Sequence, residues 1–195
     1  MLETRQCRIY LIIQIWLCCL TAHAQEQQKP VVNIARKDTH FQVSAAITMP
    51  VKPCAAYSLL TDYASLPDYI PGILEIQTER ISGDTIKVRQ VGKVKVLFFH
   101  VKMWTTLEME EIPFHRIIFK QIEGELKSYS GEWNLLETPQ GTKLSYSASL
   151  VFKHFMPLFL AKPVLENEVA TRFEAIANEA LSRKNKNSPG CGARQ

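Results

Sequence analysis

Proline and glycine are scarce in this sequence of 195 residues, which has ten prolines and eight glycines. Those numbers are too low for a collagen-like or low-complexity chain. Charge of one sign is also lacking, since 23 Lys and Arg stand against 19 Asp and Glu, for a formal net charge of +4. So small a surplus is weak evidence for a nucleic-acid partner unless the basic residues cluster. With 46% hydrophobic residues, the composition predicts one ordinary globular domain with a sizeable core.

The longest apolar run, Ile9–Leu20, lies near the N-terminus. It is too short to span a bilayer, which needs about 20 apolar residues. Two arginines precede the run, and Ala22-His23-Ala24 follows it as a small-residue cleavage site. Residues 1–24 are therefore predicted to be a signal peptide, the alternative being an uncleaved anchor. We expect a secreted or periplasmic protein, released by cleavage after Ala24.

Cysteine is scarce once the signal is removed, because only Cys54 and Cys191 of the five cysteines remain. Two cysteines could form one disulfide in an oxidising compartment. Cys54, however, lies in an apolar, helix-like stretch, and Cys191 lies in a tail with Gly and Pro. This setting favours a small buried hydrophobe and a loose thiol.

Motifs of catalysis and cofactor binding are missing. The sequence has no Gly-x-Ser-x-Gly, no phosphate-binding loop and no dinucleotide fingerprint. No Cys and His have metal-ligand spacing, so we expect neither a metal nor another cofactor. The histidines of the mature chain do not lie near a Ser or Cys nucleophile motif; they are His40, His100, His115 and His154.

The mature chain is predicted to form a strand, two short helices, six further strands and a long helix. The first strand covers His40–Thr48, where apolar and polar residues alternate, and the long helix begins at Pro163 and ends near Arg183. Short turns separate the later strands, which predicts antiparallel neighbours. Residues 25–36 are predicted to be a leader, 37–183 the folded domain, and 184–195 a basic, disordered tail. The fold class is α+β, a curved antiparallel sheet wrapped around the long helix.

Several short motifs carry a resemblance to a known family. They are Tyr57-Ser58-Leu59-Leu60-Thr61-Asp62-Tyr63, Leu66-Pro67-Asp68-Tyr69-Ile70-Pro71-Gly72, Glu123-Gly124, Gly131-Glu132-Trp133 and Gly141-Thr142. With the element order, they resemble the START-like (SRPBCC) superfamily, and within it the polyketide cyclase and coenzyme Q-binding family. The resemblance implies the helix-grip fold and a cavity for a hydrophobic ligand such as a lipid, isoprenoid, quinone or polyketide. The quinone-binding members of this family are intracellular, so the predicted export signal argues against a role with a respiratory quinone.

Strand parity identifies the residues that would line such a cavity, because the charged residues mark the outer face of each strand. The inward positions, together with two positions of the apolar helix stripe, give the candidate ligand-binding residues. These are Gln90, Met103, Thr105, Phe119, Gln121, Tyr129, Trp133, Tyr146, Val169 and Phe173. Such an apolar surface with few polar groups suits a hydrophobic ligand with one polar end. Any single one of these residues is more often core packing than a ligand contact, whereas the set, together with the resemblance, favours a pocket. The two glutamine amides are the most informative, since a buried amide needs a partner.

Two apolar segments occur where polar residues would be expected. Leu97, Phe98 and Phe99 fall at the predicted tip of a hairpin, and residues 155–160 precede the long helix. Exposed apolar tips beside Lys93 and Lys95 would suit docking on an anionic membrane. The alternative is a single bent strand in which both phenylalanines are buried.

The function predicted from the sequence is binding of a hydrophobic small molecule by an exported protein, which could also carry it. The alternative is a cyclase or dehydratase that acts on such a molecule in the same cavity, although parity places no pair of carboxylates inside it. A nucleic-acid partner is not expected, because the outer lysines are not interleaved with aromatic residues.

Overall fold

The computed structural model describes residues 29–96 and 98–186. The strands form one antiparallel sheet in the spatial order β1-β2-β8-β7-β6-β5-β4-β3. Their bounds are β1 (Val31–Lys37), β2 (His40–Met49), β3 (Ile73–Ser82), β4 (Thr85–Val96), β5 (Phe99–Ile112), β6 (Arg116–Gly124), β7 (Leu126–Thr138) and β8 (Gly141–Phe152). Between β2 and β3 lie α2 (Pro53–Thr61), the 3-10 turn η1 (Tyr63–Ser65) and α3 (Leu66–Tyr69). The long helix α4 (Leu158–Asn185) follows β8.

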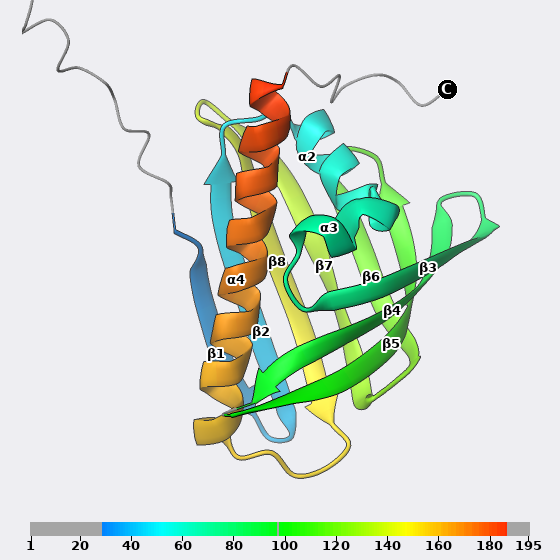
Figure 1. Ribbon diagram of the computed structural model, residues 1–195, viewed down its shortest axis with the longest axis vertical. Coiled ribbons are helices and arrows are strands. Elements are labelled where there is room, and N and C mark those ends of the chain that lie inside the picture. The colour runs from blue at the N-terminus through cyan, green and yellow to red at the C-terminus, as the bar shows by residue number, and fades with distance from the viewer. Residues whose placement is uncertain (1–28, 97, 187–195) are drawn as a thin grey trace, which may run out of the picture.

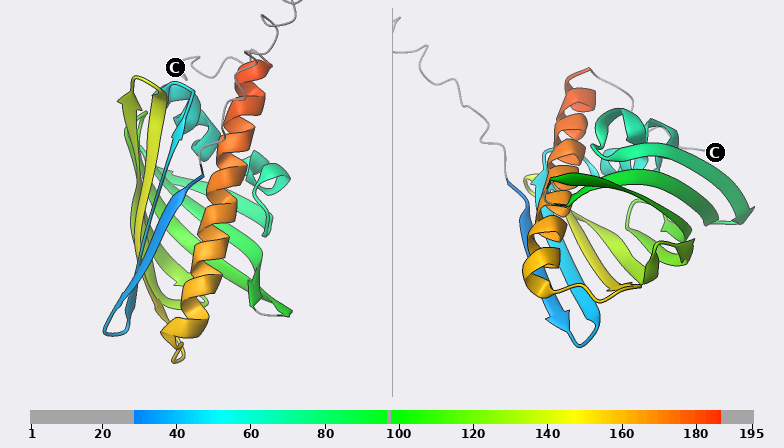
Figure 2. Two further views of the ribbon diagram at one scale, coloured as in Figure 1. Left: turned by 90° about the vertical axis from the view of Figure 1, so that its left-hand side faces the viewer. Right: turned by 60° about the horizontal axis from the view of Figure 1, so that its bottom comes forward.

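The sheet is strongly curved, and α4 lies along its concave side (Figure 1). A second view shows β3, β4 and β5 coming round toward the helix, while α2 and α3 cover one end of the concavity (Figure 2). Helix α4 contacts β1, β2 and β4 as well as α2 and α3. This is the helix-grip arrangement that the sequence predicted.

Alternation along the strands produces the core. In β2, every second side chain from Phe41 to Ile47 is buried, and the residues between them are exposed or half-buried. In α4 the buried side chains are Ala161, Phe173, Ile176, Ala177 and Ala180, one stripe on the side that faces the sheet. The inward face deduced from the outer lysines of β4 and β5 is also correct, since Val88 and Leu107 are 3% and 7% exposed.

Two boundaries differ from the prediction. Residues 31–36, predicted to belong to a leader, are part of β1, which pairs with β2 along its whole length. The error arose because β1 is an edge strand with exposed polar residues, so its apolar alternation is weak. Helix α4 begins at Leu158, before Pro163, and ends at Asn185. Pro163 therefore lies inside the helix, where it lacks the N–H that would bond to the carbonyl of Phe159.

The short motifs of the sequence have structural reasons. Gly131 lies where β7 approaches β8 so closely that a Cβ atom would meet backbone atoms of Ser147 and Ala148. Gly141 has a φ of 127°, which other residues rarely adopt, and a Cβ there would clash with the backbone at Met49 and Pro50. The fully buried Thr142 donates its hydroxyl to the carbonyl of Val51 at 2.7 Å. Gly141 and Thr142 hold the chain between β2 and α2 against the start of β8.

The tyrosines of the first motif attach the short helices to the sheet. Tyr57 and Tyr63 donate their hydroxyls to the two carboxylate oxygens of Glu111, at 3.0 and 2.7 Å. Burial, and then the hydrogen bond to Glu111, raise the pKa of Tyr63 far above its usual value. At the other side of this end, Arg183 of α4 contacts Asp62 at 3.1 Å. Both contacts close the end of the concavity that is remote from the β4–β5 hairpin.

Cys54 is disulfide-bonded. This corrects its interpretation as a buried free thiol, an interpretation that rested only on the apolar neighbours of Cys54. The predicted signal peptide, Cys191 and most of the predicted tail lie outside the described residues. No helix of the described part of the chain is long and apolar enough to cross a membrane.

Candidate functional site

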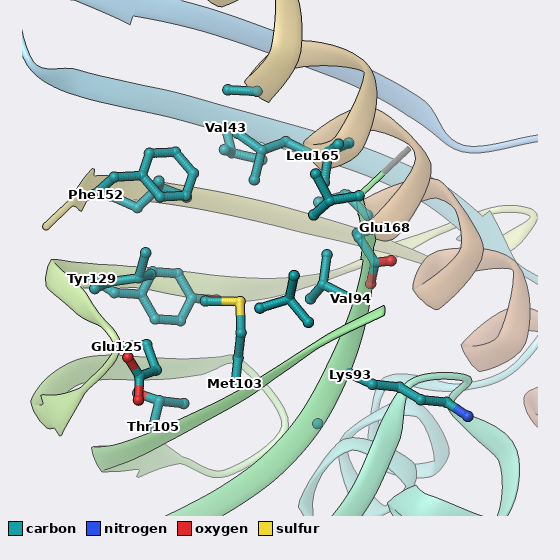
Figure 3. A pocket seen from close by; sticks show the side chains of 18 of the residues that line it. Val43, Lys93, Val94, Met103, Thr105, Glu125, Tyr129, Phe152, Leu165 and Glu168 are labelled. Atoms are coloured by element: carbon teal, nitrogen blue, oxygen red, sulfur yellow. The ribbon is translucent and has the colours of Figure 1, made fainter. Parts of the chain in front are cut away.

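A cavity of about 430 Å³ lies between the concave face of the sheet and α4. Its walls come from β2 and from β4 to β8, and α4 closes it with residues 160–172 (Figure 3). Most lining side chains are aliphatic or aromatic, among them Val43, Met103, Phe152 and Leu165. This size and lining are typical of a site for a hydrophobic small molecule.

Seven of the ten predicted ligand-binding residues line this cavity. They are Gln90, Met103, Thr105, Gln121, Tyr129, Tyr146 and Val169. Strand parity therefore places most of the candidate residues around one space, and their role in binding stays a prediction.

The other three candidates, Phe119, Trp133 and Phe173, do not line the cavity but pack around Tyr146 beside it. Trp133 stacks on Phe173 with ring centroids 5.3 Å apart and contacts Tyr146 at 4.6 Å. Phe119 lies against Tyr129 at 4.8 Å. Phe119 and Phe173 are 2% and 1% exposed, so they are core residues. Parity gives the direction of a side chain but not whether the helix covers it, and α4 covers this part of the sheet.

The two glutamines of the predicted polar anchor differ. The Gln121 side chain donates to the carbonyl of Leu126 at 2.9 Å and accepts from the hydroxyl of Thr105 at 3.2 Å. Its amide thus bridges two strands and is already satisfied. Gln90 is half-buried and lines the cavity, and no side-chain hydrogen bond joins it to another described residue. Of the pair, Gln90 alone can offer a free amide to a ligand.

Tyr129 and Tyr146 form a buried hydroxyl pair on neighbouring strands, with 2.8 Å between the oxygens. Either hydroxyl can be the donor, so one of the two protons lies between the oxygens and the other is available to a third group. Burial is the main cause that raises the pKa of both phenols. The pair therefore stays neutral and acts as a hydrogen-bonding group, and its raised pKa makes it a poor proton donor to a substrate.

Sequence reasoning missed a charged pair in the cavity. Glu168 and Arg172 of α4 both line it, with 3.7 Å between Arg172 Nη2 and Glu168 Oε2. Neither residue was among the predicted site residues, because charged residues on helices are mostly exposed. The missed signal was spacing, because Leu165, Glu168 and Arg172 follow one another at three and four residues and so share a face.

One open end of the cavity carries exposed aromatic residues. Phe98 and Phe99 are 90% and 72% exposed, so the hairpin tip is exposed and the alternative of a buried bent strand is wrong. Leu97 lies outside the described residues. Phe155 and Phe159, at the start of α4, are 80% and 81% exposed. Both groups lie at the same end of the molecule (Figures 1 and 2), and we call these four residues the aromatic rim.

Aliphatic residues next to the aromatic rim line the cavity, which places the cavity mouth between the two halves of the rim. They are Val94, Val96, Val101, Met156 and Leu160. Lys93 also borders the cavity, and its ammonium group points away from the interior (Figure 3).

No group of three or more His, Cys, Asp or Glu side chains in the described part of the chain could hold a metal ion.

Comparison with known proteins agrees with this architecture. The family model described as polyketide cyclase/dehydrase and lipid transport matches residues 49–177, about two thirds of the sequence. No curated protein sequence matches the chain.

Solved structures with the same fold are distant in sequence. The Zhui aromatase/cyclase from Streptomyces sp. R1128 is 16% identical with a TM-score of 0.66, and the match covers 76% of this chain and 98% of that one. A STAR-related lipid transfer protein from Xanthomonas axonopodis is 10% identical with a TM-score of 0.64, over 80% and 94% of the two chains. A protein from Thermus thermophilus is 21% identical with a TM-score of 0.61, over 72% and 97%.

Proposed function

Because the chain belongs to the polyketide cyclase/dehydrase and lipid transport family, we propose that it binds one hydrophobic small molecule in the cavity under α4 and carries it. The observation that supports this most is the cavity of about 430 Å³, whose aliphatic and aromatic lining continues to the aromatic rim at its mouth. The apolar part of a lipid-, isoprenoid- or polyketide-like molecule would leave water and pack against this lining. Each methylene buried in this way would contribute about 0.8 kcal/mol to the free energy of binding.

We also propose that the protein acts after export, in an oxidising compartment. The A-x-A site after the N-terminal apolar run supports this. A disulfide at Cys54 agrees with such a compartment, because disulfides persist in secreted and periplasmic proteins and are rare in the cytosol.

A cyclase or dehydratase that works in the same cavity is the second candidate. The observation in its favour is the set of polar groups around the tyrosine pair, which could orient a polyketide-like substrate. Against it, the raised pKa of Tyr129 and Tyr146 weakens both as acids. Carriage requires only the cavity and its mouth, and we therefore prefer it.

Native mass spectrometry of the protein purified from its own host tests binding. We expect a reproducible mass increment of one small molecule that organic solvent removes and that lipid analysis identifies. Protein that is always free of ligand, even when lipids are added during purification, would contradict the proposal.

Docking of the aromatic rim on an anionic membrane is part of the proposed carriage. Four exposed phenylalanines surround the mouth. The β4–β5 hairpin that carries Phe98 and Phe99 also carries Lys93, Lys95 and Lys102. Aromatic side chains can enter the interface of the bilayer while basic side chains meet anionic headgroups.

Replacing Phe98 and Phe99 by Ser is expected to weaken binding to anionic vesicles by at least about tenfold. A factor of ten requires about 1.4 kcal/mol, less than the burial of a single phenylalanine contributes. Co-sedimentation with phosphatidylglycerol-containing vesicles measures the effect. The matched control replaces Ile81 and Leu136, which are 52% and 62% exposed and lie away from the rim, by Ser. Equal binding of both double variants would show that the rim does not dock.

A further inference from the structure

The cavity is apolar at its mouth and polar at its inner end. Leu160 lies at the mouth and Arg172 at the inner end, and both belong to α4. At 1.5 Å per residue they are about 18 Å apart along the helix axis. The sheet has the same gradient, because Val96 of β4 lies at the mouth and Gln90 lies six residues further in. A ligand that fits both ends has a long apolar part and one polar group.

The polar end offers more hydrogen-bond donors than the protein uses. Arg172 Nε is buried and has no hydrogen-bond partner. An unsatisfied buried donor costs about 1–3 kcal/mol, so it calls for an explanation. The tyrosine pair has one further proton to donate, and the amide of Gln90 can donate as well. An acceptor group on a ligand would satisfy these donors.

The contact between Arg172 and Glu168 leaves the guanidinium available. At 3.7 Å it is longer than a hydrogen bond, and it involves only Nη2. The Arg172 side chain is 31% exposed, so it has room to turn. Its charge also reaches the tyrosine pair, where it opposes the effect of burial on both phenols. Arg172 is thus a cation directed at the polar end of the cavity and only loosely paired.

A carboxylate fits this end better than a phosphate does. The planar guanidinium can donate from Nε and one Nη to the two oxygens of a carboxylate. A phosphate with two negative charges would face one arginine and the carboxylate of Glu168. Lys102 also lines the cavity, but it lies opposite Lys93 and next to Val101 at the mouth, so it is not a second cation at the inner end. Lys93 does not serve as one, because its ammonium group points away from the cavity (Figure 3).

We propose that the ligand is an acidic lipid, a long aliphatic or isoprenoid chain with one carboxylate, bound with the carboxylate against Arg172 and the chain toward the aromatic rim. This rests on the proposed function, because it names the ligand class of the same cavity. Arg172 determines the specificity for an acid, and Glu168 weakens it by competing for the guanidinium.

Titration of the protein with hexadecanoic acid and with its methyl ester at neutral pH tests the proposal. We expect the acid to bind at least about tenfold more tightly than the ester, as a charge-assisted pair would provide. In R172Q the acid should lose about this factor, while the ester should change less than about twofold. In E168Q the acid should bind more tightly than in wild type, because a competing negative charge is removed. K184Q removes an exposed charge of the same helix and should leave both affinities unchanged.

The outcomes separate the two proposals. If acid and ester bind equally to wild type, and R172Q does not alter either affinity, the carboxylate proposal is overturned while the proposed function stands. If neither probe binds, and the protein from its own host also carries no ligand, both fail. If R172Q does not fold, E168Q still tests the carboxylate proposal. Loss of a purely structural ion pair between Glu168 and Arg172 would not increase the affinity for the acid, whereas the proposal predicts that E168Q binds the acid more tightly.

Discussion

Filling the cavity at Val169 with tryptophan is expected to lower the affinity for a hydrophobic ligand by about a hundredfold or more, which is about 2.7 kcal/mol. Val169 is half-buried on α4 and lines the cavity opposite the sheet. An indole at this position would occupy the space between α4 and the strands that a ligand needs. The fold should tolerate the change better than a substitution in the close-packed core, because the new ring enters open space. Fluorescence titration with the neutral dye Nile red measures the loss.

The matched control for this substitution is Val31→Trp. Val31 lies on the edge strand β1 and is 64% exposed, so an indole there adds the same group without entering the cavity. The control should bind the dye as wild type does. If V169W binds as tightly as V31W while both are folded, the cavity is not where hydrophobic ligands bind.

Truncating Phe173 to alanine is expected to destabilise the protein by about 3–5 kcal/mol. The ring is 1% exposed and packs against Trp133 and Tyr146, with centroids 5.3 and 6.4 Å away. Its removal leaves a void where α4 meets the sheet, and neighbouring side chains in a close-packed core fill such a void only in part. Urea unfolding monitored by circular dichroism gives the change in the free energy of unfolding.

Met103→Ala is the comparison for this substitution, since Met103 is half-buried and already borders the cavity. Its truncation should cost clearly less than F173A and should instead alter ligand affinity. A loss of less than about 1 kcal/mol for F173A would contradict its assignment to the core, because truncation of a buried Phe costs several times more. It would favour the interpretation of Phe173 as a ligand-binding residue.

Sequence patterns predicted the fold well because its two main periodicities are strong. Lysines on one side of β4 and β5 fix the inward parity of these strands, and the stripe from Leu165 to Ala180 identifies the face of α4. The exception among the strands is β1, an edge strand with four exposed residues out of seven. Pairing with β2 and contact with α4 hold this strand, and neither has a local sequence pattern.

The site was predicted less completely, for physical reasons that particular residues show. Phe173 and Met103 have the same inward direction by pattern, and only the packing of α4 makes one core and the other cavity wall. Glu168 and Arg172 were not predicted to belong to the site, because charged residues on helices are mostly exposed. Their place in the cavity depends on how α4 is rotated over the sheet. The disulfide of Cys54 likewise depends on which distant cysteine comes near it, which no local pattern indicates.

The most direct test of binding in the cavity is the native mass spectrum of wild type and V169W, both purified from the protein's own host under identical conditions. We expect wild type to carry one small molecule per chain and V169W to be free of it, with unchanged folding. Bound molecule at equal occupancy in both proteins, or in neither, would contradict the assignment of the cavity as the ligand site.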